Sequence, residues 1–312
     1  MSNRVHIICQ PEAGGGLGQK RLREVQDVLC DFQMEYLTYL TDFRVDAQAL
    51  VQQLITRGHT PYDDHLLVVG GDGTLSQVVA AMQQMGAEVP LTFVPAGSGN
   101  DFARSWVVGQ SVDDIIRRML FQRQPRQVPV FTYREHHSGQ SGVIMNNFGM
   151  GFDAQANHSA LVKRQAGLGI FKLWPRLSYY YGIIDNLNKI PHFEVQLTID
   201  DRHWLIDDCS LFAVMNSPYL GGGIHLDLQT LAVKPELAAV ALHHVDRSQL
   251  AHLIKSILFT KKVPNPTSFT RYTGTSLRVQ TDQPVHCQVD GEDLYLLQVD
   301  LEVAISSYPF YL

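Results

Sequence analysis

The segment from Val68 to Thr74 reads Val-Val-Gly-Gly-Asp-Gly-Thr, and no other part of the sequence constrains the fold as strongly. Apolar residues precede the three glycines and recur after them at helical spacing, which predicts a buried strand, a tight loop and a helix. Glycines have no Cβ to keep an anion away from the backbone amides, and the start of a helix favours negative charge. One carboxylate, Asp72, lies inside this loop. It indicates either a metal ion bridging two charges or a group that accepts a proton.

A second glycine-rich loop follows the next predicted strand. The segment from Ala96 to Asp101 reads Ala-Gly-Ser-Gly-Asn-Asp, with Asn100 or Asp101 as the expected N-cap of a short helix. In an open α/β sheet both loops would leave the carboxyl ends of parallel strands, where ligands bind. Either loop by itself is equally well explained as a steric turn. Two acid-bearing loops in consecutive strand–helix units favour a binding site.

The composition excludes several classes of protein. The chain has 312 residues, 45% of them hydrophobic and 18% charged, which is typical of a globular protein of about two domains. The formal net charge of −6 argues against nucleic-acid binding. Neither the four cysteines nor the thirteen histidines show metal-ligating spacing. Without a signal peptide or an apolar run near the ~20 residues that span a bilayer, we expect a cytoplasmic protein that visits a membrane surface transiently.

The pattern of elements divides the chain into two parts. Strands and helices alternate in residues 1–124, which predicts a doubly wound, mostly parallel sheet. Pro125 and Pro129 mark the boundary, and strands dominate residues 125–303, which predicts antiparallel pairing. The predicted helices are 19–30, 46–57, 74–85 and 112–121. The predicted strands are 5–9, 34–40, 65–69, 91–95, 128–133, 142–148, 193–199, 204–215, 238–243, 276–280, 285–289 and 295–305.

Residues 163–189 interrupt the strand-rich part. They combine five Lys or Arg residues and a single acid with five aromatic residues. This mixture is typical of a segment at a membrane interface, and equally of a helix that packs its aromatic side chains into the core. Pro175 and Gly182 argue against one continuous helix.

These motifs together resemble the catalytic domain of the diacylglycerol kinase family, in its branch of soluble bacterial lipid kinases, which are related to sphingosine kinases. The resemblance implies an N-terminal doubly wound domain of the NAD kinase and phosphofructokinase type. It also implies a β-rich antiparallel second domain, an active site in the cleft between the two, and a C-terminal tail, about residues 304–312, that packs back on the first domain. The matching segments are 10–16, 70–74, 95–104, 147–154, 216–223 and 290–292.

The resemblance further implies a kinase that uses ATP and Mg²⁺ to phosphorylate the hydroxyl of a membrane lipid such as diacylglycerol. Asp72 is the first choice for the carboxylate that accepts the substrate proton or orders the metal, and Asp290 and Glu292 complete the catalytic set. Mg²⁺ would be held by Asp72, Asp101 and Glu292. Asp153 would hold the polar head of the substrate; Asp101 and Asp153 are equally well explained as helix caps. The residues implied to contact the nucleotide are Gln10, Thr41, Gly70, Gly71, Gly73, Thr74, Gly97, Ser98, Asn100 and Arg164.

The chain departs from the family pattern at several positions. Gln10 stands where the family has Asn, and Gln77 where it has an acid. After Gly223 the acids that support a structural metal in the bacterial branch are missing, and Lys234 stands near one of their positions. We therefore predict that no structural Mg²⁺ binds at residues 233–237 and that the lysine charge replaces it.

Two other functions remain open. A kinase of a soluble alcohol such as NAD would share the Gly-Gly-Asp-Gly loop, although the Asn-Glu pair typical of NAD kinases is missing after the second loop. A nucleotide-binding regulator without catalysis is favoured by the departures at Gln10 and Gln77. The expected partners are a membrane lipid, contacted through residues 163–189, and no nucleic acid, while a homodimer is left open.

Overall fold

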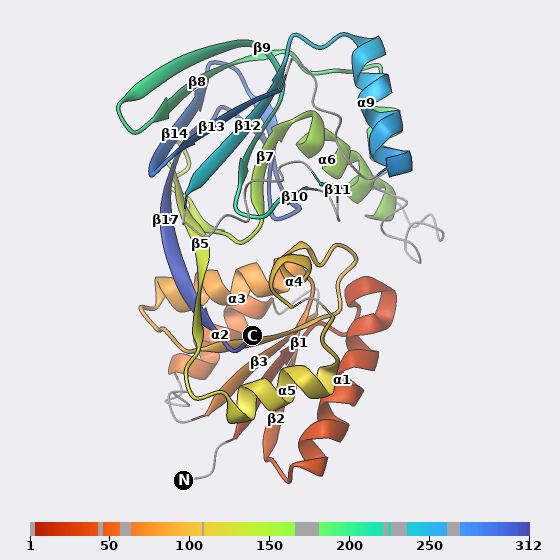
Figure 1. Ribbon diagram of the computed structural model, residues 1–312, viewed down its shortest axis with the longest axis vertical. Helices are drawn as coiled ribbons and strands as arrows, with labels where there is room; N and C mark the ends of the chain where they lie inside the picture. Colours follow the sequence, from red (N-terminus) through yellow and green to blue (C-terminus); the bar gives the residue numbers. More distant parts are fainter. Residues whose placement is uncertain are drawn as a thin grey trace. The chain divides into compact units, whose positions relative to one another are not determined.

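The computed structural model describes residues 4–42, 46–56, 64–107, 109–165, 181–220, 224–225, 236–260 and 269–312 (Figure 1). The chain forms two compact units, one made of Met1–Val128 with Ser307–Leu312 and the other of Pro129–Ser306. The sequence predicts a domain boundary between residues 124 and 125, and a C-terminal tail from about residue 304 that packs on the first domain. Two strands, β5 (Arg126–Glu135) and β17 (Asp300–Phe310), contain the residues at which the chain passes from one unit to the other.

The first unit is built on a parallel sheet with the strand order β2-β1-β3-β4. Phe310, at the end of β17, pairs in parallel with Leu91 at the start of β4. The central strands β1 and β3 are almost entirely buried, as expected for continuous apolar runs covered by helices on both faces. The predicted parallel α/β fold is therefore confirmed. The strands are β1 (Val5–Cys9), β2 (Tyr36–Leu40), β3 (His65–Gly70) and β4 (Leu91–Pro95).

Strand order determines where the helices of this unit lie. The chain moves from β1 to β2 in one direction and from β2 through β3 to β4 in the other, so right-handed crossovers place the first helix on one face and the next two on the opposite face. In agreement, α1 packs against α5, and α2 packs against α3 (Figure 1). The helices are α1 (Ala13–Asp31), α2 (Ala47–Thr56), α3 (Asp72–Gln84), α4 (Asp101–Trp106) and α5 (Val112–Phe121).

The second unit contains an antiparallel sheet with the order β16-β15-β7-β9-β8-β14-β17. Strand β12 pairs with β9 and β13, and β5 pairs with β6 and β17. Burial alternates along β8, as expected when one face of a sheet meets the core. The predicted antiparallel domain is confirmed. Its remaining strands are β6 (Ser141–Ile144), β7 (Asn147–Gly151), β8 (Phe193–Ile199), β9 (Arg202–Met215), β10 (Tyr219–Leu220), β11 (Ile224–His225), β12 (Leu237–His243), β13 (Phe269–Gly274), β14 (Ser276–Thr281), β15 (Val285–Val289) and β16 (Glu292–Leu297).

Helices α6 (Phe152–Gln165) and α9 (Arg247–Thr260) cover part of this sheet (Figure 1). Phe152 of α6 and Leu250 of α9 belong to the same buried cluster as Val240 of β12. The sequence analysis missed α9, although its start carries a readable signal. Asp246 and Gln249 each accept the backbone N–H of the other, the reciprocal arrangement of a capping box.

Two segments predicted as single strands are each two strands, so those predictions are wrong. The segment 142–148 divides at Met145 and Asn146, whose amides donate to the carboxylate of Asp290 instead of to a neighbouring strand. The segment 295–305 divides before Asp300, where the N–H of Val299 donates to Thr281 Oγ1 at 3.0 Å. In both places a side chain replaces a strand as the partner of the backbone.

In the part of the chain that the structure describes, no helix has both the length and the apolar character needed to cross a bilayer.

An ion pair between neighbouring strands makes the stability of the second unit depend on pH. Arg278 of β14 donates through Nε and Nη2 to the two carboxylate oxygens of Asp300 on β17, both at 2.8 Å. These hydrogen bonds lower the pKa of Asp300. A lowered pKa in the folded state means that the carboxylate stabilises the fold above its unfolded pKa of about 4, and that this stabilisation is lost as the pH falls through the folded value.

We therefore expect the free energy of unfolding of Asp300→Asn to lie furthest below that of the wild type near neutral pH, and the difference to shrink below about pH 4. Urea unfolding at a series of pH values measures it. The exposed Asp282→Asn is the control, with an expected effect within about 0.5 kcal/mol at neutral pH. A difference that stays constant across the acid range would contradict the assignment.

Candidate functional site

Four strand ends meet at one edge of the first unit's sheet. Because β1 to β4 are parallel, the segments that follow them all leave the same edge, and the direction of connection reverses between β1 and β3. The loop after β1 and the loop after β3 are joined across this reversal, since Thr74 Oγ1 donates to Gln10 Oε1 at 2.7 Å. Thr41, directly after β2, donates its N–H to the carbonyl of Cys9. Most of the residues predicted to contact a nucleotide thus lie along one edge.

The glycines of these loops allow the loops to pack against one another. A Cβ on Gly97 would lie 2.6 Å from Gly71 Cα, and a Cβ on Gly14 would lie 2.3 Å from the carbonyl oxygen of Ala96. Both distances are far shorter than a carbon–carbon or carbon–oxygen contact allows. The sequence analysis interpreted the glycines as room for a ligand. In the structure, the main effect of the missing Cβ atoms at Gly71 and Gly97 is that the two loops can contact each other.

Asp72 connects the two glycine-rich loops. It is the first residue of α3, and its oxygens Oδ2 and Oδ1 accept the N–H groups of Asp101 and Phe102, both at 3.1 Å. These are the first amides of α4, whose N-cap, Asn100, has a left-handed backbone (φ 54°) and makes no capping hydrogen bond with its side chain. The prediction that Asn100 or Asp101 is the N-cap of this helix is confirmed for Asn100, but the carboxylate that accepts the first amides comes from Asp72 in the other loop.

Two buried oxygens at this edge lack hydrogen-bond partners. Thr41 Oγ1 and Asn100 Oδ1 are both inaccessible to solvent and bond to none of the described residues. A buried polar atom without a partner costs about 1–3 kcal/mol, so such atoms mark places where a ligand or an ion supplies the missing bond. Gln77 has a different task. Its Oε1 accepts the N–H of Ala47 at 3.2 Å, at the start of α2.

In the second unit, Asp290 holds the turn that joins β6 to β7. Its carboxylate accepts the N–H groups of Met145, Asn146 and Asn147 at 2.9, 2.7 and 3.0 Å. Asp290 has a left-handed backbone (φ 51°), and its own N–H donates to the carbonyl of Asn147. Three amide donors occupy much of the accepting capacity of the carboxylate. The local geometry therefore favours a positioning role for Asp290.

A buried amide connects this turn to Asp153. Gln288 Nε2 donates to Asn147 Oδ1 at 2.6 Å and to Asp153 Oδ2 at 3.0 Å, while its Oε1 accepts the N–H of Gly291 at 2.7 Å. A Cβ on Gly149 would come within 2.7 Å of two atoms in this network, so the glycine is required there. The sequence analysis missed Gln288. A polar amide between the apolar residues Cys287 and Val289 of β15 was the signal that could have revealed it.

Glu292 differs from Asp290 in its surroundings. It begins β16 and is exposed to solvent. Burial raises the pKa of Tyr133, on β5, and the carboxylates of Asp290 and Glu292 raise it further, so its ring lies within electrostatic reach of both acids. Tyr133 is another residue that the sequence analysis missed.

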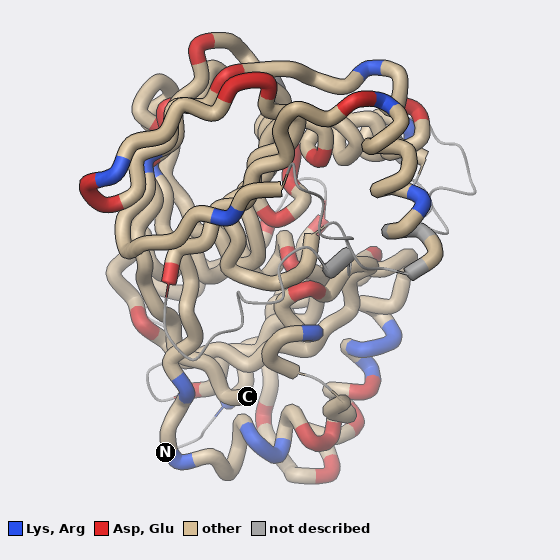
Figure 2. Tube along the Cα trace, turned by 45° about the horizontal axis from the view of Figure 1, so that its top comes forward, with Lys and Arg blue, Asp and Glu red and all other residues tan. Residues whose placement is uncertain are grey.

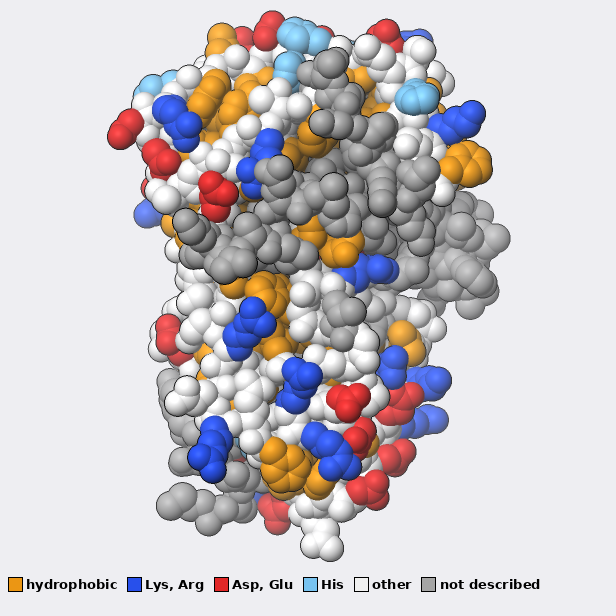
Figure 3. Space-filling view, in the orientation of Figure 1, with side chains coloured by type: hydrophobic (Ala, Val, Ile, Leu, Met, Phe, Trp, Pro, Cys, Tyr) orange, Lys and Arg blue, Asp and Glu red, His pale blue; other side chains and the backbone are white. Residues whose placement is uncertain are grey.

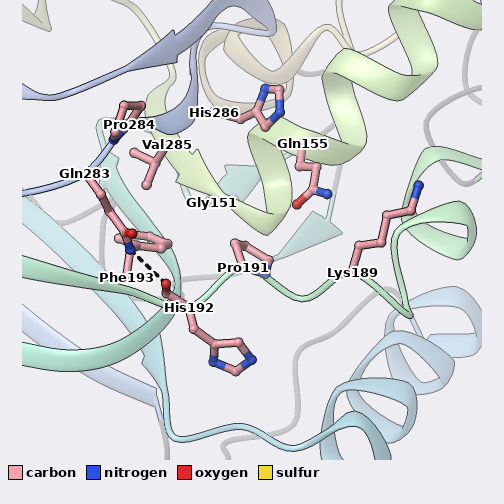
Figure 4. A pocket seen from close by; sticks show the side chains of 10 residues that line it. All are labelled: Gly151, Gln155, Lys189, Pro191, His192, Phe193, Gln283, Pro284, Val285 and His286. Atoms are coloured by element: carbon pink, nitrogen blue, oxygen red, sulfur yellow. Dashed lines mark hydrogen bonds between the residues drawn. The ribbon is translucent and has the colours of Figure 1, made fainter.

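A small pocket of about 280 Å³ lies elsewhere in the second unit (Figure 4). Its walls come from α6, from the segment that enters β8 and from the start of β15. Its polar side chains include Gln155, Lys189 and His286, and Gln283 Nε2 donates to the carbonyl of His192 on one wall. The residues predicted from the sequence to form the active site do not line this pocket.

Several predictions fall outside the described residues. They concern residues 166–180, the glycines 221–223 and Lys234 with its neighbours up to 235, as well as the side chain of Arg164. The remaining predicted residues form two sets, one in each unit. Their meeting across the units, and the catalytic, metal and substrate roles assigned to them, stay predictions.

We expect Asp72→Ala to lower the free energy of unfolding by about 2 kcal/mol, because two amides at the start of α4 lose their acceptor. Urea unfolding measures this loss. Asp113→Ala is the matched control, since Asp113 lies at the start of α5 and makes an exposed ion pair with Arg117. The control should lose less than about 0.5 kcal/mol. Equal losses in the two variants would show that the Asp72 contacts do not support the loop.

We expect Asp290→Asn to destabilise the protein by about 2–3 kcal/mol, because an amide nitrogen would face backbone donors. Glu292→Gln, two residues further, should stay within about 0.5 kcal/mol of the wild type because its side chain is exposed. Chemical unfolding of both variants measures whether Asp290 supports the fold more strongly than Glu292 does. The reverse order of stability would contradict the assignment.

Comparison with known proteins identifies both parts of the chain. Residues 4–133 match the diacylglycerol kinase catalytic domain, and residues 147–306 match the YegS C-terminal NAD kinase beta sandwich-like domain. YtlR of Bacillus subtilis (strain 168), whose name proposes a lipid kinase, is 27% identical over 227 residues, which cover 70% of each chain. A YegS-like protein of Pseudomonas syringae pv. tomato (strain ATCC BAA-871 / DC3000), named in the same way, is 29% identical over 219 residues, 69% of this chain and 66% of the relative.

A solved structure shows the same fold. A proposed diacylglycerol kinase from Bacillus anthracis str. Sterne superimposes with a TM-score of 0.71 at 20% identity, covering 99% of this chain and 97% of the other. With both domain types matched in order along one chain, the protein belongs to the diacylglycerol kinase catalytic-domain family, in the bacterial lipid kinase branch that carries a YegS-type C-terminal domain.

Proposed function

We propose that the chain transfers the γ-phosphate of ATP to the hydroxyl of a membrane lipid such as diacylglycerol. The observation that carries the proposal is the sheet edge of the first unit. There the loops after β3 and β4 are locked together by Asp72, and two buried oxygens, of Thr41 and Asn100, lack protein partners among the described residues. Because the chain belongs to a kinase family, we assign the binding of the nucleotide to this edge.

The edge has the components that a nucleotide site needs. Glycine amides and the start of α3 favour phosphate oxygens, and the hydroxyl of Thr41 is a donor without a protein acceptor among the described residues. Gln10 is already oriented by its hydrogen bond with Thr74. The nucleotide contacts proposed for Gly70, Gly71, Gly73, Gly97, Ser98 and Arg164 come from the resemblance of their motifs to the family.

The donor set at this edge suits a hard cation. The two oxygens of Asp72 accept the amides of Asp101 and Phe102, and Asn100 contributes a buried carbonyl oxygen that has no hydrogen-bond partner among the described residues. Mg²⁺ prefers such oxygen ligands, and in phosphoryl transfer it neutralises the charge of the phosphate groups. We assign Asp72, Asp101 and Glu292 to hold it.

The acids differ in their structural roles, and we assign their catalytic roles accordingly. Asp72 and Asp290 hold backbone amides, so their first task is positioning. Glu292 begins β16 with an exposed side chain at the turn that Asp290 anchors, and we assign it to accept the proton of the substrate hydroxyl. Asp153 is buried against Gln288, and its proposed contribution to substrate binding acts through that network.

The described flanks of residues 163–189 support contact with a membrane surface. Lys163 Nζ lies 5.2 Å from the centre of the Tyr181 ring, and the side chains of Val162 and Ile184 are 46% and 54% exposed. Figure 3 shows hydrophobic side chains among charged ones on the visible face. In Figure 2 acidic and basic segments follow one another along the described trace. The homodimer stays a prediction.

The test is the transfer of labelled γ-phosphate from ATP to lipid in mixed micelles of diacylglycerol, counted after organic extraction. We expect the wild type to label the lipid and Glu292→Gln to be slower by about 100-fold or more, with an unchanged free energy of unfolding. Glu302→Gln, an exposed glutamate of β17, is the matched control and should keep the wild-type rate. Equal rates in the wild type and Glu292→Gln would sink the assignment of Glu292.

The same assay separates the alternatives. Label that appears in NAD and not in lipid would identify a kinase of a soluble alcohol. ATP that binds without transfer to any acceptor would identify a regulator. Asp72→Ala is also assayed, and its activity is interpreted together with its free energy of unfolding, because this substitution removes a structural contact as well as a proposed catalytic group.

A further inference from the structure

The second unit brings together two histidines and an aspartate that belong to none of the predicted sites. His158 lies on α6, His286 on β15 and Asp293 on β16, and one ligand atom from each lies within 4.8 Å of the others. On the face shown in Figure 3, the visible histidine side chains belong to the second unit. We propose that His158, His286 and Asp293 form a binding site for a divalent transition metal of the zinc class.

The contacts within this cluster are short. His158 Nδ1 lies 2.5 Å from Asp293 Oδ2, and the rings of His158 and His286 are 5.0 Å apart at an interplanar angle of 33°. His286 Nδ1 is buried and has no hydrogen-bond partner among the described residues. A buried imidazole nitrogen without a partner is the kind of atom that a metal ion satisfies.

A β-bulge orients the carboxylate of Asp293 toward the two histidines. The pairing of β15 with β16 shifts between Cys287 and Gln288, which inserts Leu294 as an extra residue in β16. Next to it, Tyr295 has a left-handed backbone (φ 64°), and its N–H donates to Asp293 Oδ1 at 2.8 Å. Only 2% of the Asp293 side chain is exposed. One oxygen is therefore fixed by the backbone while the other is presented to His158, which is how outer hydrogen bonds orient metal ligands.

The donor atoms of the three side chains indicate which metal the site would bind. Two imidazole nitrogens and one carboxylate oxygen suit zinc and its neighbours among the first-row metals, whereas Mg²⁺ prefers oxygen ligands throughout. A metal ion can also reach the cluster, because His286 forms part of the wall of the open pocket in Figure 4 and a third of the His158 side chain is exposed. Imidazole binds metals in its neutral form, so the affinity of such a site falls as the pH is lowered.

The site would join three elements that surround the turn at Asp290 and Gly291. His286 and Asp293 lie on the two strands that this turn connects, and Asn157, next to His158 on α6, donates to the carbonyl of Gly291 at 2.7 Å. A metal would therefore tie α6 to both sides of the turn. The inference goes beyond the proposed function, because metal binding and protection of the turn are measured without any kinase assay.

The experiment uses the metal-free full chain without a polyhistidine tag. Zn²⁺ alone is titrated by calorimetry in the presence of excess Mg²⁺, and Co²⁺ is titrated separately and followed by its visible absorption. The wild type should bind one Zn²⁺ per chain. His286→Asn and His158→Gln should bind at least about 100-fold more weakly, since loss of a ligand costs no less than loss of its supporting partner.

His192→Asn is the matched control. Its Nδ1 lies 2.5 Å from Asp208 Oδ1, as close as the pair in the cluster, but both side chains are largely exposed. It should keep wild-type affinity and show the same rise in melting temperature with Zn²⁺, which the two cluster variants lose. Hydrogen exchange at the 290–292 turn should slow with Zn²⁺ in the wild type and the control only.

No Zn²⁺ uptake by the wild type, or wild-type affinity in both cluster variants, would overturn the proposal. Circular dichroism shows whether each variant is folded. If both cluster variants fail to fold, the Co²⁺ spectrum of the wild type decides the outcome. The intense absorption of a low-coordinate ion supports the site, and the weak absorption of hydrated Co²⁺ refutes it.

Discussion

The carboxylate of Asp72 is the contact on which the candidate site of the first unit depends. It begins α3 and at the same time caps α4, so one side chain sets the spacing between two glycine-rich loops. The close approach of the two loops requires that Gly97 has no Cβ and leaves little room for one at Gly71, and it brings the amides of both loops to one edge of the sheet. An acid that looks out of place in an anion-binding loop is thus explained first by the backbone it supports, and its proposed work with a metal is additional to that support.

In the second unit, a larger polar network holds the backbone around the predicted site residues. Asp290 accepts three backbone amides of the turn between β6 and β7, and Gln288 links Asn147 of β7 to the buried Asp153 beside the apolar core. Buried polar groups are costly unless they are paired, and fully paired groups hold a single geometry. The network leaves Glu292 exposed beside a rigid turn. This division between acids that position and an acid that is available is the basis of the proposed mechanism and of the paired variants that test it.

Sequence periodicity predicted the regular elements well where one physical cause dominates. The bounds of β1, β4, β8, β15 and α5 agree with the prediction, because each is an apolar or alternating run that ends at turn residues or caps. The prediction was wrong where a distant side chain takes over the backbone hydrogen bonds, as Asp290 does between β6 and β7. It placed the N-cap of α4 correctly at Asn100 but missed the acceptor of the first amides, since no local pattern shows that Asp72, 29 positions earlier than Asp101, occupies them.

The sequence by itself determined the two fold types, the order of the loops and the family, because these depend on local periodicity and on motifs of adjacent residues. Only the tertiary structure decided what the polar residues contact. His158 and Asp293 lie 135 positions apart, and no ligand spacing connects them, yet a bulge and a helix bring them into contact. The physical reason is that hydrogen bonds and metal ligation act over about 2–3 Å in space, whatever the separation along the chain.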